Sequence, residues 1–185
     1  MNPQAAEIAR ANALLNTNTQ TEIAVLNVGV SSETADAVPC LYKDFALVVR
    51  PDEAKTTQLM VEKFKKANID LVTLDTITQT RGLRPKMIKI DVEGSQMSIL
   101  RGADTVLRDF APVLLFEGNA PGASNSDGTP MAKLCLHLMQ TYGYQIVAMN
   151  HRAWNSSPIS LTQAQIESGT PKLDRNQLFV CFPSN

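Results

Sequence analysis

The second half of the chain alternates between apolar strand patterns and amphipathic helix patterns. Short apolar runs typical of strands occupy residues 86–92, 111–117, 144–150 and 177–183. Helical patterns cover residues 94–110 and 131–143, and the second is expected to end at Gly143. The inward positions of the first helix are Met97, Leu100, Ala103 and Leu107. This order of elements predicts an α/β fold with a parallel sheet.

The first half carries weaker patterns. A helix is expected to begin at Pro3, with Ile8, Ala11 and Leu15 on its apolar face. Its expected successors are a strand over 22–32, an antiparallel or edge strand over 39–50, a helix over 56–68 and an extended piece over 71–77. Residues 151–176 read as loop, with one helical turn at 161–167.

Length, charge and cysteine content limit the function classes. The 185 residues suit a single domain over 1–185, and 17 basic against 18 acidic side chains give no footprint for nucleic acid. The basic cluster of Lys63, Lys65 and Lys66 fits the solvated face of a helix. The cysteines have no metal or redox spacing and are expected to be buried thiols: Cys40, Cys135 and Cys181. No signal peptide or membrane span is apparent, so a cytoplasmic soluble protein is expected.

Polar residues follow three of the expected strands, namely Asp91, Glu117 and Asn150. Ligands of open α/β sheets bind beyond the carboxyl ends of the strands, so Asp91 and Glu117 should border one crevice, with Glu93 two residues further on. Such carboxylates can act as general bases, hold Mg²⁺, or bind ligand hydroxyls. Structural roles stay open too, because Glu93 suits a helix N-terminus and Asp91 can cap the amides of residues 95–97.

A longer motif changes this picture. KIDVEG at 89–94, LRGA at 100–103 and LLFE at 114–117 follow one another at the spacing of the FkbM methyltransferase family, which the chain resembles. TLD at 73–75, YGYQI at 142–146 and NQLFVCF at 176–182 resemble flanking elements of the same family. The resemblance therefore extends over nearly the whole chain.

The resemblance implies a Rossmann-like sheet and S-adenosylmethionine-dependent transfer of a methyl group, typically to a hydroxyl oxygen of a sugar or secondary metabolite. Asp91 would border donor and acceptor, and Glu93 and Glu117 would line the acceptor pocket. Gly29 and Val30 would lie near the adenine. Asp91 or Glu117 is the expected base, a Mg²⁺ requirement stays open, and His151 is a weaker candidate.

The resemblance also implies an incomplete site, since the family's first two strands and first helix have no counterpart. They supply a glycine-rich turn for the donor and an acid for its ribose, whereas NVGVSS at 27–32 has one glycine and precedes another strand. Without them the strand at 86–92 should have an unpaired edge, and the chain alone should bind donor weakly.

Several explanations of this incompleteness remain open. The chain can be a fragment, a mis-started reading frame, or half of a site that a partner chain completes. The alternative function is a non-catalytic remnant that serves as a binding module. A metal-dependent hydrolase is disfavoured because no histidine lies near the carboxylates in sequence. The acceptor is not identified, although residues 119–130 and 151–176, including Trp154, are placed to shape its pocket.

Overall fold

A computed structural model describes most of the chain. The described residues are 3–16, 21–43, 47–49, 65–92, 94–118, 130–150, 157–170, 173 and 177–184. The chain divides into two compact units, Met1–Val72 and Thr73–Asn185, and each is described by itself. The expectation of a single domain over residues 1–185 stays a prediction.

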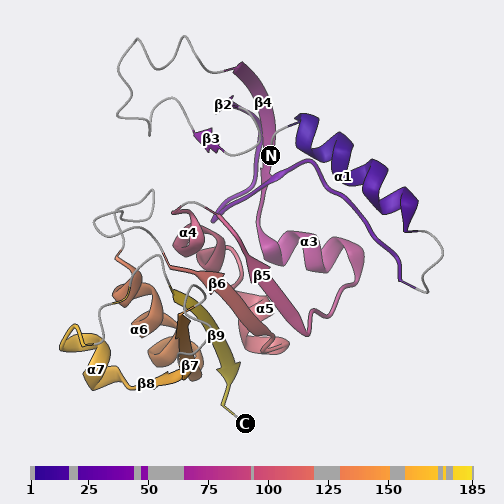
Figure 1. Cartoon of the computed structure of the whole chain (residues 1–185). Coiled ribbons are helices and arrows are strands. Elements are labelled where there is room, and N and C mark those ends of the chain that lie inside the picture. Colours follow the sequence, from indigo (N-terminus) through magenta and orange to yellow (C-terminus); the bar gives the residue numbers. More distant parts are fainter. Residues whose placement is uncertain are drawn as a thin grey trace. The chain divides into compact units, whose positions relative to one another are not determined.

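The first unit contains a four-stranded mixed sheet in the order β1-β4-β2-β3 (Figure 1). Its strands are β1 (Gly29–Val30), β2 (Ala35–Lys43), β3 (Leu47–Val49) and β4 (Lys65–Val72). β1 runs parallel to β4, whereas β2 runs antiparallel to both β3 and β4. The strand expected over 22–32 is thus regular only in β1, and the one expected over 39–50 is divided between β2 and the edge strand β3.

Helix α1 (Pro3–Leu15) begins at the proline, as expected. Its packing differs from the expectation, because Ile8 is 50% and Leu15 is 80% exposed, while Ala6 is fully buried. Ile8 and Leu15, which were predicted to face inward, are therefore accessible to solvent, and the buried side of the helix is marked by the small side chain of Ala6. The spacing correctly predicted the helix but not its buried face.

Strand β4 contradicts the helix expected over 56–68 and, with it, the helical face to which Lys65 and Lys66 were assigned. Residues 65–68 were expected to end a helix but instead begin the strand. The earlier part of the expected helix, residues 56–64, lies outside the described residues. Ile69 and Leu71 are buried, whereas Asp70 between them and Lys66 before them are exposed. Buried and exposed side chains thus alternate with the period of two that is typical of a strand. Pairing with β1 on one side and β2 on the other outweighs the local helical tendency.

The extended piece expected over 71–77 ends early, because helix α3 (Leu74–Arg81) follows at once. The Thr73 hydroxyl caps this helix by accepting a hydrogen bond of 3.0 Å from the amide of Thr76. At the other end, Gly82 adopts the left-handed conformation, with φ of 61°, that terminates helices. The cap and the glycine show why TLD opens a helix and does not continue a strand.

The second unit contains a five-stranded mixed sheet in the order β5-β6-β9-β7-β8 (Figure 1). Its strands are β5 (Met87–Ile90), β6 (Val113–Glu117), β7 (Tyr144–Asn150), β8 (Ile159–Leu161) and β9 (Gln177–Pro183). β5 and β6 are parallel, but β9 lies between β6 and β7 and runs antiparallel to both. The expected parallel sheet is therefore a mixed one, in which β5, β6 and β7 still point the same way.

The helices of this unit largely follow their sequence patterns. The helix expected over 94–110 is divided into α4 (Gln96–Arg101) and α5 (Asp104–Asp109), and the four positions expected to point inward are all buried. Helix α6 (Met131–Tyr142) ends at Gly143, as expected. Helix α7 (Gln163–Glu167) forms the expected turn behind a capping box. β8 was not expected, since it falls within the stretch read as loop.

The core of the second unit lies around β6 and β9. Phe116 and Phe179 stack with their ring centroids 5.3 Å apart, and both are fully buried. Cys135 and Cys181 of this unit are buried thiols, as expected, as is Cys40 of the first unit, and burial raises the pKa of the Cys135 thiol to about 12. None of the described helices is both long and apolar enough to span a membrane.

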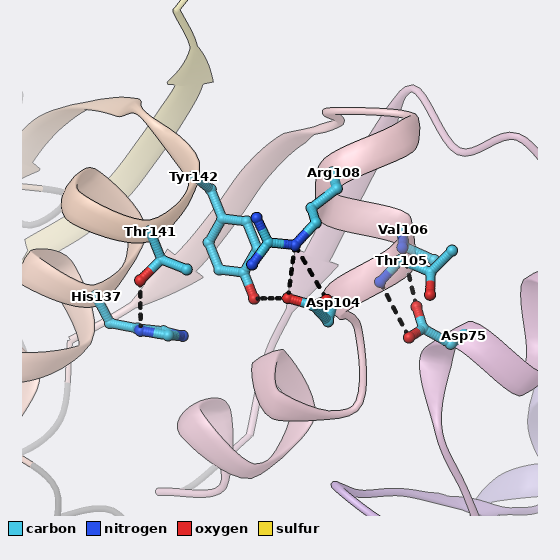
Figure 2. A network of polar contacts seen from close by, with 8 residues as sticks. All are labelled: Asp75, Asp104, Thr105, Val106, Arg108, His137, Thr141 and Tyr142. Atoms are coloured by element: carbon cyan, nitrogen blue, oxygen red, sulfur yellow. Dashed lines mark hydrogen bonds and ion pairs between the residues drawn. The ribbon is translucent and has the colours of Figure 1, made fainter.

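Polar contacts tie three helices of this unit together. Figure 2 shows the Asp75 carboxylate of α3 accepting hydrogen bonds from the amides of Thr105, at 3.1 Å, and Val106, at 2.9 Å. These amides belong to the first turn of α5, so Asp75 caps that helix from a distant part of the chain. α4 and α5 thus form separate helices with Asp75 at their junction, where its own amide also bonds Gly102.

A second group of contacts joins α5 to α6. The Asp104 carboxylate accepts a hydrogen bond of 2.8 Å from the Tyr142 hydroxyl and pairs with Arg108 at 3.1 Å (Figure 2). The Arg108 guanidinium lies 5.1 Å from the centre of the Tyr142 ring. The bonds from Arg108 and Tyr142 lower the pKa of Asp104, while burial and the bond to Asp104 raise that of Tyr142 to about 12. These contacts join α5 to α6, so the perturbed pKa values of Asp104 and Tyr142 have a structural explanation.

Candidate functional site

Two of the predicted acids lie together at one edge of the five-stranded sheet. Ile90 is opposite Phe116 in the parallel pair of β5 and β6, so Asp91 and Glu117 are each one position beyond this pair. Ile90 and Phe116 are buried, whereas Asp91 and Glu117 are exposed. Since successive strand residues point to opposite faces, the two acids are placed on the face opposite to the two buried side chains. The strand-end geometry thus has the arrangement that the sequence predicted.

The third strand-end residue belongs to the same edge. β7 runs antiparallel to β9, as β6 does, so the carboxyl ends of β6 and β7 meet on one side of the sheet. Leu178 of β9 faces Glu117 on one flank and Met149, the neighbour of Asn150, on the other. A row of polar positions therefore borders the sheet at the end where ligands of α/β folds bind.

Lys89 is a member of this site that the sequence reasoning missed. Its ammonium donates a hydrogen bond of 2.8 Å to Oδ2 of Asp91, and the two side chains are 56% and 60% exposed. This bond, with the charges of Asp91 and Glu117, raises the pKa of Lys89. The signal was present in the sequence, because residues two apart on a strand share a face. One cation among the acids makes the site less negative than its carboxylates alone suggest.

Gln96 is the second residue that the sequence reasoning missed. It opens α4, is 1% exposed, and donates from Nε2 to the carbonyl oxygen of Val92 at 2.9 Å and of Glu117 at 3.4 Å. A buried glutamine in a helical pattern reads as an ordinary surface position, so the sequence carried little warning. Asp91 bonds Lys89 and does not cap the amides of residues 95–97 that the alternative reading assigned to it.

The structure describes only some of the other predicted site residues. Glu93, His151 and Trp154 lie outside the described residues, as do 119–129. Gly29 and Val30 form β1 of the first unit, where a Cβ on Gly29 would come within 2.6 Å of a methyl of Leu71. Close packing of β1 on β4 is therefore a structural reason for this glycine, and its place near an adenine stays a prediction.

A metal site is not apparent in the part of the chain that the structure describes. No three His, Cys, Asp or Glu side chains gather there in a way that could hold an ion. Mg²⁺ often uses one or two carboxylates and completes its shell with water. Asp91 and Glu117 supply that number of acids, but Lys89 already occupies one oxygen of Asp91. A Mg²⁺ requirement thus stays a prediction from the sequence.

Two hollows are lined by residues other than the acids. One of about 330 Å³ lies between α3 and α5, and Arg84 at its rim packs over the Phe110 ring at 5.9 Å. The other, of about 470 Å³, lies beside α1 in the first unit. Neither hollow is lined by a predicted site residue. The acids instead stand on an exposed rim, where carboxylates are well hydrated and can accept hydrogen bonds from hydroxyl groups.

Comparisons with known proteins find a matching family and a similar fold. The model of the "Methyltransferase FkbM domain" matches residues 2–146. A crystal structure of methyltransferase FkbM from Methylobacillus flagellatus KT is similar over 95% of this chain, with a TM-score of 0.51 and 19% identity. At that identity the likeness shows the fold alone, and the chain spans about a third of that protein, 32% of its length. No curated protein matches the chain.

The family match includes the elements that build the rim. β5, the turn after it, α4, α5 and β6 all fall within residues 2–146, as do Asp91 and Glu117. Since the family model matches most of the chain, the chain belongs to the FkbM methyltransferase family.

Proposed function

We propose that the protein takes part in S-adenosylmethionine-dependent methyl transfer to a hydroxyl oxygen of a small molecule, such as a sugar or secondary metabolite. The observation that carries the proposal is the pair of exposed carboxylates at the parallel ends of β5 and β6, in a chain of a methyltransferase family. When bound, the donor supplies an electrophilic methyl group on a cationic sulfur. The protein must then orient an acceptor hydroxyl and remove its proton.

The two acids divide these tasks unequally. Oδ2 of Asp91 already accepts a hydrogen bond from the Lys89 ammonium at 2.8 Å, so this oxygen is less accessible to an acceptor hydroxyl. Glu117 has no hydrogen-bond partner for its carboxylate among the described residues. We therefore assign proton removal to Glu117, and the binding of a hydroxyl group near the donor to Asp91. Gly29 and Val30 remain the proposed adenine contacts, and Glu93 the proposed second acid of the acceptor pocket.

A substitution pair tests this division. Glu117→Gln keeps the shape of the side chain and its ability to bond a hydroxyl, but removes the base, and should lower kcat by about 100-fold or more. Asp91→Asn should mainly raise KM, since it weakens binding. Transfer from tritiated S-adenosylmethionine to a panel of sugars, in protein that carries a complete donor site, gives both constants. If Asp91→Asn loses kcat while Glu117→Gln retains it, the assignment is reversed.

The proposal includes a donor site that another polypeptide segment completes. β5 ends the five-stranded sheet and β1 ends the four-stranded one, and among the described residues neither has a strand on its outer side. The outer edge of β5 therefore presents backbone N–H and C=O groups with which a further strand can pair. A parallel strand followed by a glycine turn would pair with β5 and bring backbone amides to the rim of acids. The protein is proposed to act in the cytoplasm, without nucleic acid or membrane partners.

A further inference from the structure

The side chain of Gln96 spans the two strand ends that carry the acids. Its Nε2 donates to the carbonyl oxygen of Val92, the residue after Asp91, at 2.9 Å. The same nitrogen approaches the carbonyl oxygen of Glu117 at 3.4 Å. The residue is 1% exposed, so these contacts form in a shielded place where hydrogen bonds are strong and missing partners are costly.

The Val92 oxygen that Gln96 contacts also accepts a hydrogen bond from the backbone that follows β5. Gly94 adopts φ of 93°, and its amide donates to the same Val92 oxygen at 3.0 Å. Val92 therefore receives one bond from within the turn and one from α4. The end of β6 is held on its other flank, where the Gly118 amide donates to Gln177 of β9 at 2.8 Å. Gln96 thus contacts both the chain that follows β5 and the end of β6.

Packing alone does not require a glutamine at this position. Met97, Ile99 and Leu100 of the same helix fill the neighbouring space with apolar side chains. An unbranched apolar residue would fill a similar volume without the cost of burying an amide. The hydrogen bonds to the carbonyl groups of Val92 and Glu117 are a reason for an amide at this position.

We infer that Gln96 is a positioning residue that sets the separation between Asp91 and Glu117. Its importance for methyl transfer rests on the proposed function, whereas its bracing of the two strand ends does not. Without the brace, the turn that carries Asp91 would move relative to β6, and the two carboxylates would lose their fixed spacing. A site that must align a hydroxyl with a methyl group tolerates little such movement.

Hydrogen exchange of the chain tests the brace without donor or acceptor. Gln96→Met removes both donated bonds and should lower the protection of the Gly94 and Gly118 amides by about tenfold, the scale of one hydrogen bond. Ile99→Val is the matched control, because it removes a buried methylene of the same helix and touches neither carbonyl. In the control, the two glycine amides should change no more than the amides of β6 do.

A second variant separates bracing from packing. Gln96→Glu can still donate one bond when its carboxyl group is protonated, but when ionised it repels both carbonyl oxygens. Carbonyl ¹³C shifts of Val92 and Glu117 should therefore stay near the wild-type values at low pH and move upfield as the introduced carboxyl group ionises. A packing role would leave these two shifts independent of that ionisation.

The outcomes distinguish the two proposals. Equal protection losses across β6 and the two glycines in Gln96→Met, or shifts in Gln96→Glu that do not follow its ionisation, overturn the brace. If the brace is confirmed and the completed protein with Gln96→Met transfers methyl groups at the wild-type rate, the proposed site is wrong and the brace stands. A fall in kcat that the Ile99→Val control does not share supports both.

Discussion

Removing the Asp75 carboxylate is expected to destabilise the second unit in a way that can be worked out from its two bonds. Asp75→Ala leaves the amides of Thr105 and Val106 without the acceptors they have at 3.1 and 2.9 Å. Loss of an N-cap typically costs ~1 kcal/mol, and an unsatisfied buried donor costs ~1–3 kcal/mol. Val106 is fully buried, but Thr105 is exposed and can bond water instead. The expected loss in unfolding free energy is therefore about 2 kcal/mol.

Urea unfolding followed by circular dichroism measures this loss, read as a lower midpoint at an unchanged slope. Asp75→Asn retains one acceptor oxygen and should lose about half as much. Asp109→Ala is the control, because it removes an exposed acid at the other end of α5, where a negative charge is unfavourable. A loss below ~0.5 kcal/mol for Asp75→Ala, or an equal loss for Asp109→Ala, would refute the capping role.

Three further predictions concern other parts of the chain. Gly29→Val places side-chain atoms where a methyl of Leu71 comes within 2.6 Å of a Cβ, so thermal unfolding should show a loss of ~1–3 kcal/mol, part of which Leu71→Ala restores. Burial raises the pKa of Tyr142 to about 12, so the folded state holds this proton more tightly than the unfolded state. The protonated Tyr142 hydroxyl therefore stabilises the folded state fully below the unfolded pKa of about 10, and this stabilisation is lost as the pH rises to about 12. Urea midpoints should fall less steeply over that pH range in Tyr142→Phe than in the wild type. The buried cysteines should react with a thiol reagent at pH 8 only as fast as the chain unfolds, and reaction in the folded state would contradict their burial.

Local sequence patterns were sufficient to predict a helix or strand where the tertiary surroundings favour the same structure as the local sequence does. β5, β6, α6 and β9 were all predicted, because each has either an apolar run or a clear helical period with a glycine stop. β4 and α3 were not, because strand pairing on both sides decided the first and a threonine cap decided the second. The position of β9 between β6 and β7, antiparallel to both, could not be read from the sequence, since it pairs segments far apart in the chain.

The candidate site was predicted in part for the same reason. Asp91 and Glu117 follow directly from where two apolar strands end, and the parallel pairing of β5 and β6 brings them to one edge. The family motif also drew attention to TLD, yet the acid of that motif, Asp75, caps a helix. Gln96 escaped notice because its partners are backbone carbonyl groups, which no side-chain pattern reveals.

Calorimetric titration with S-adenosylmethionine tests most directly the central claim, that the acids of β5 and β6 belong to a methyltransferase site completed by another segment. The purified chain is first shown to be folded by circular dichroism, and is then titrated alone and joined to the polypeptide encoded directly upstream. The account predicts no binding by the folded chain alone and binding by the joined protein. Micromolar binding by the chain alone, or none by the folded joined protein, would contradict it.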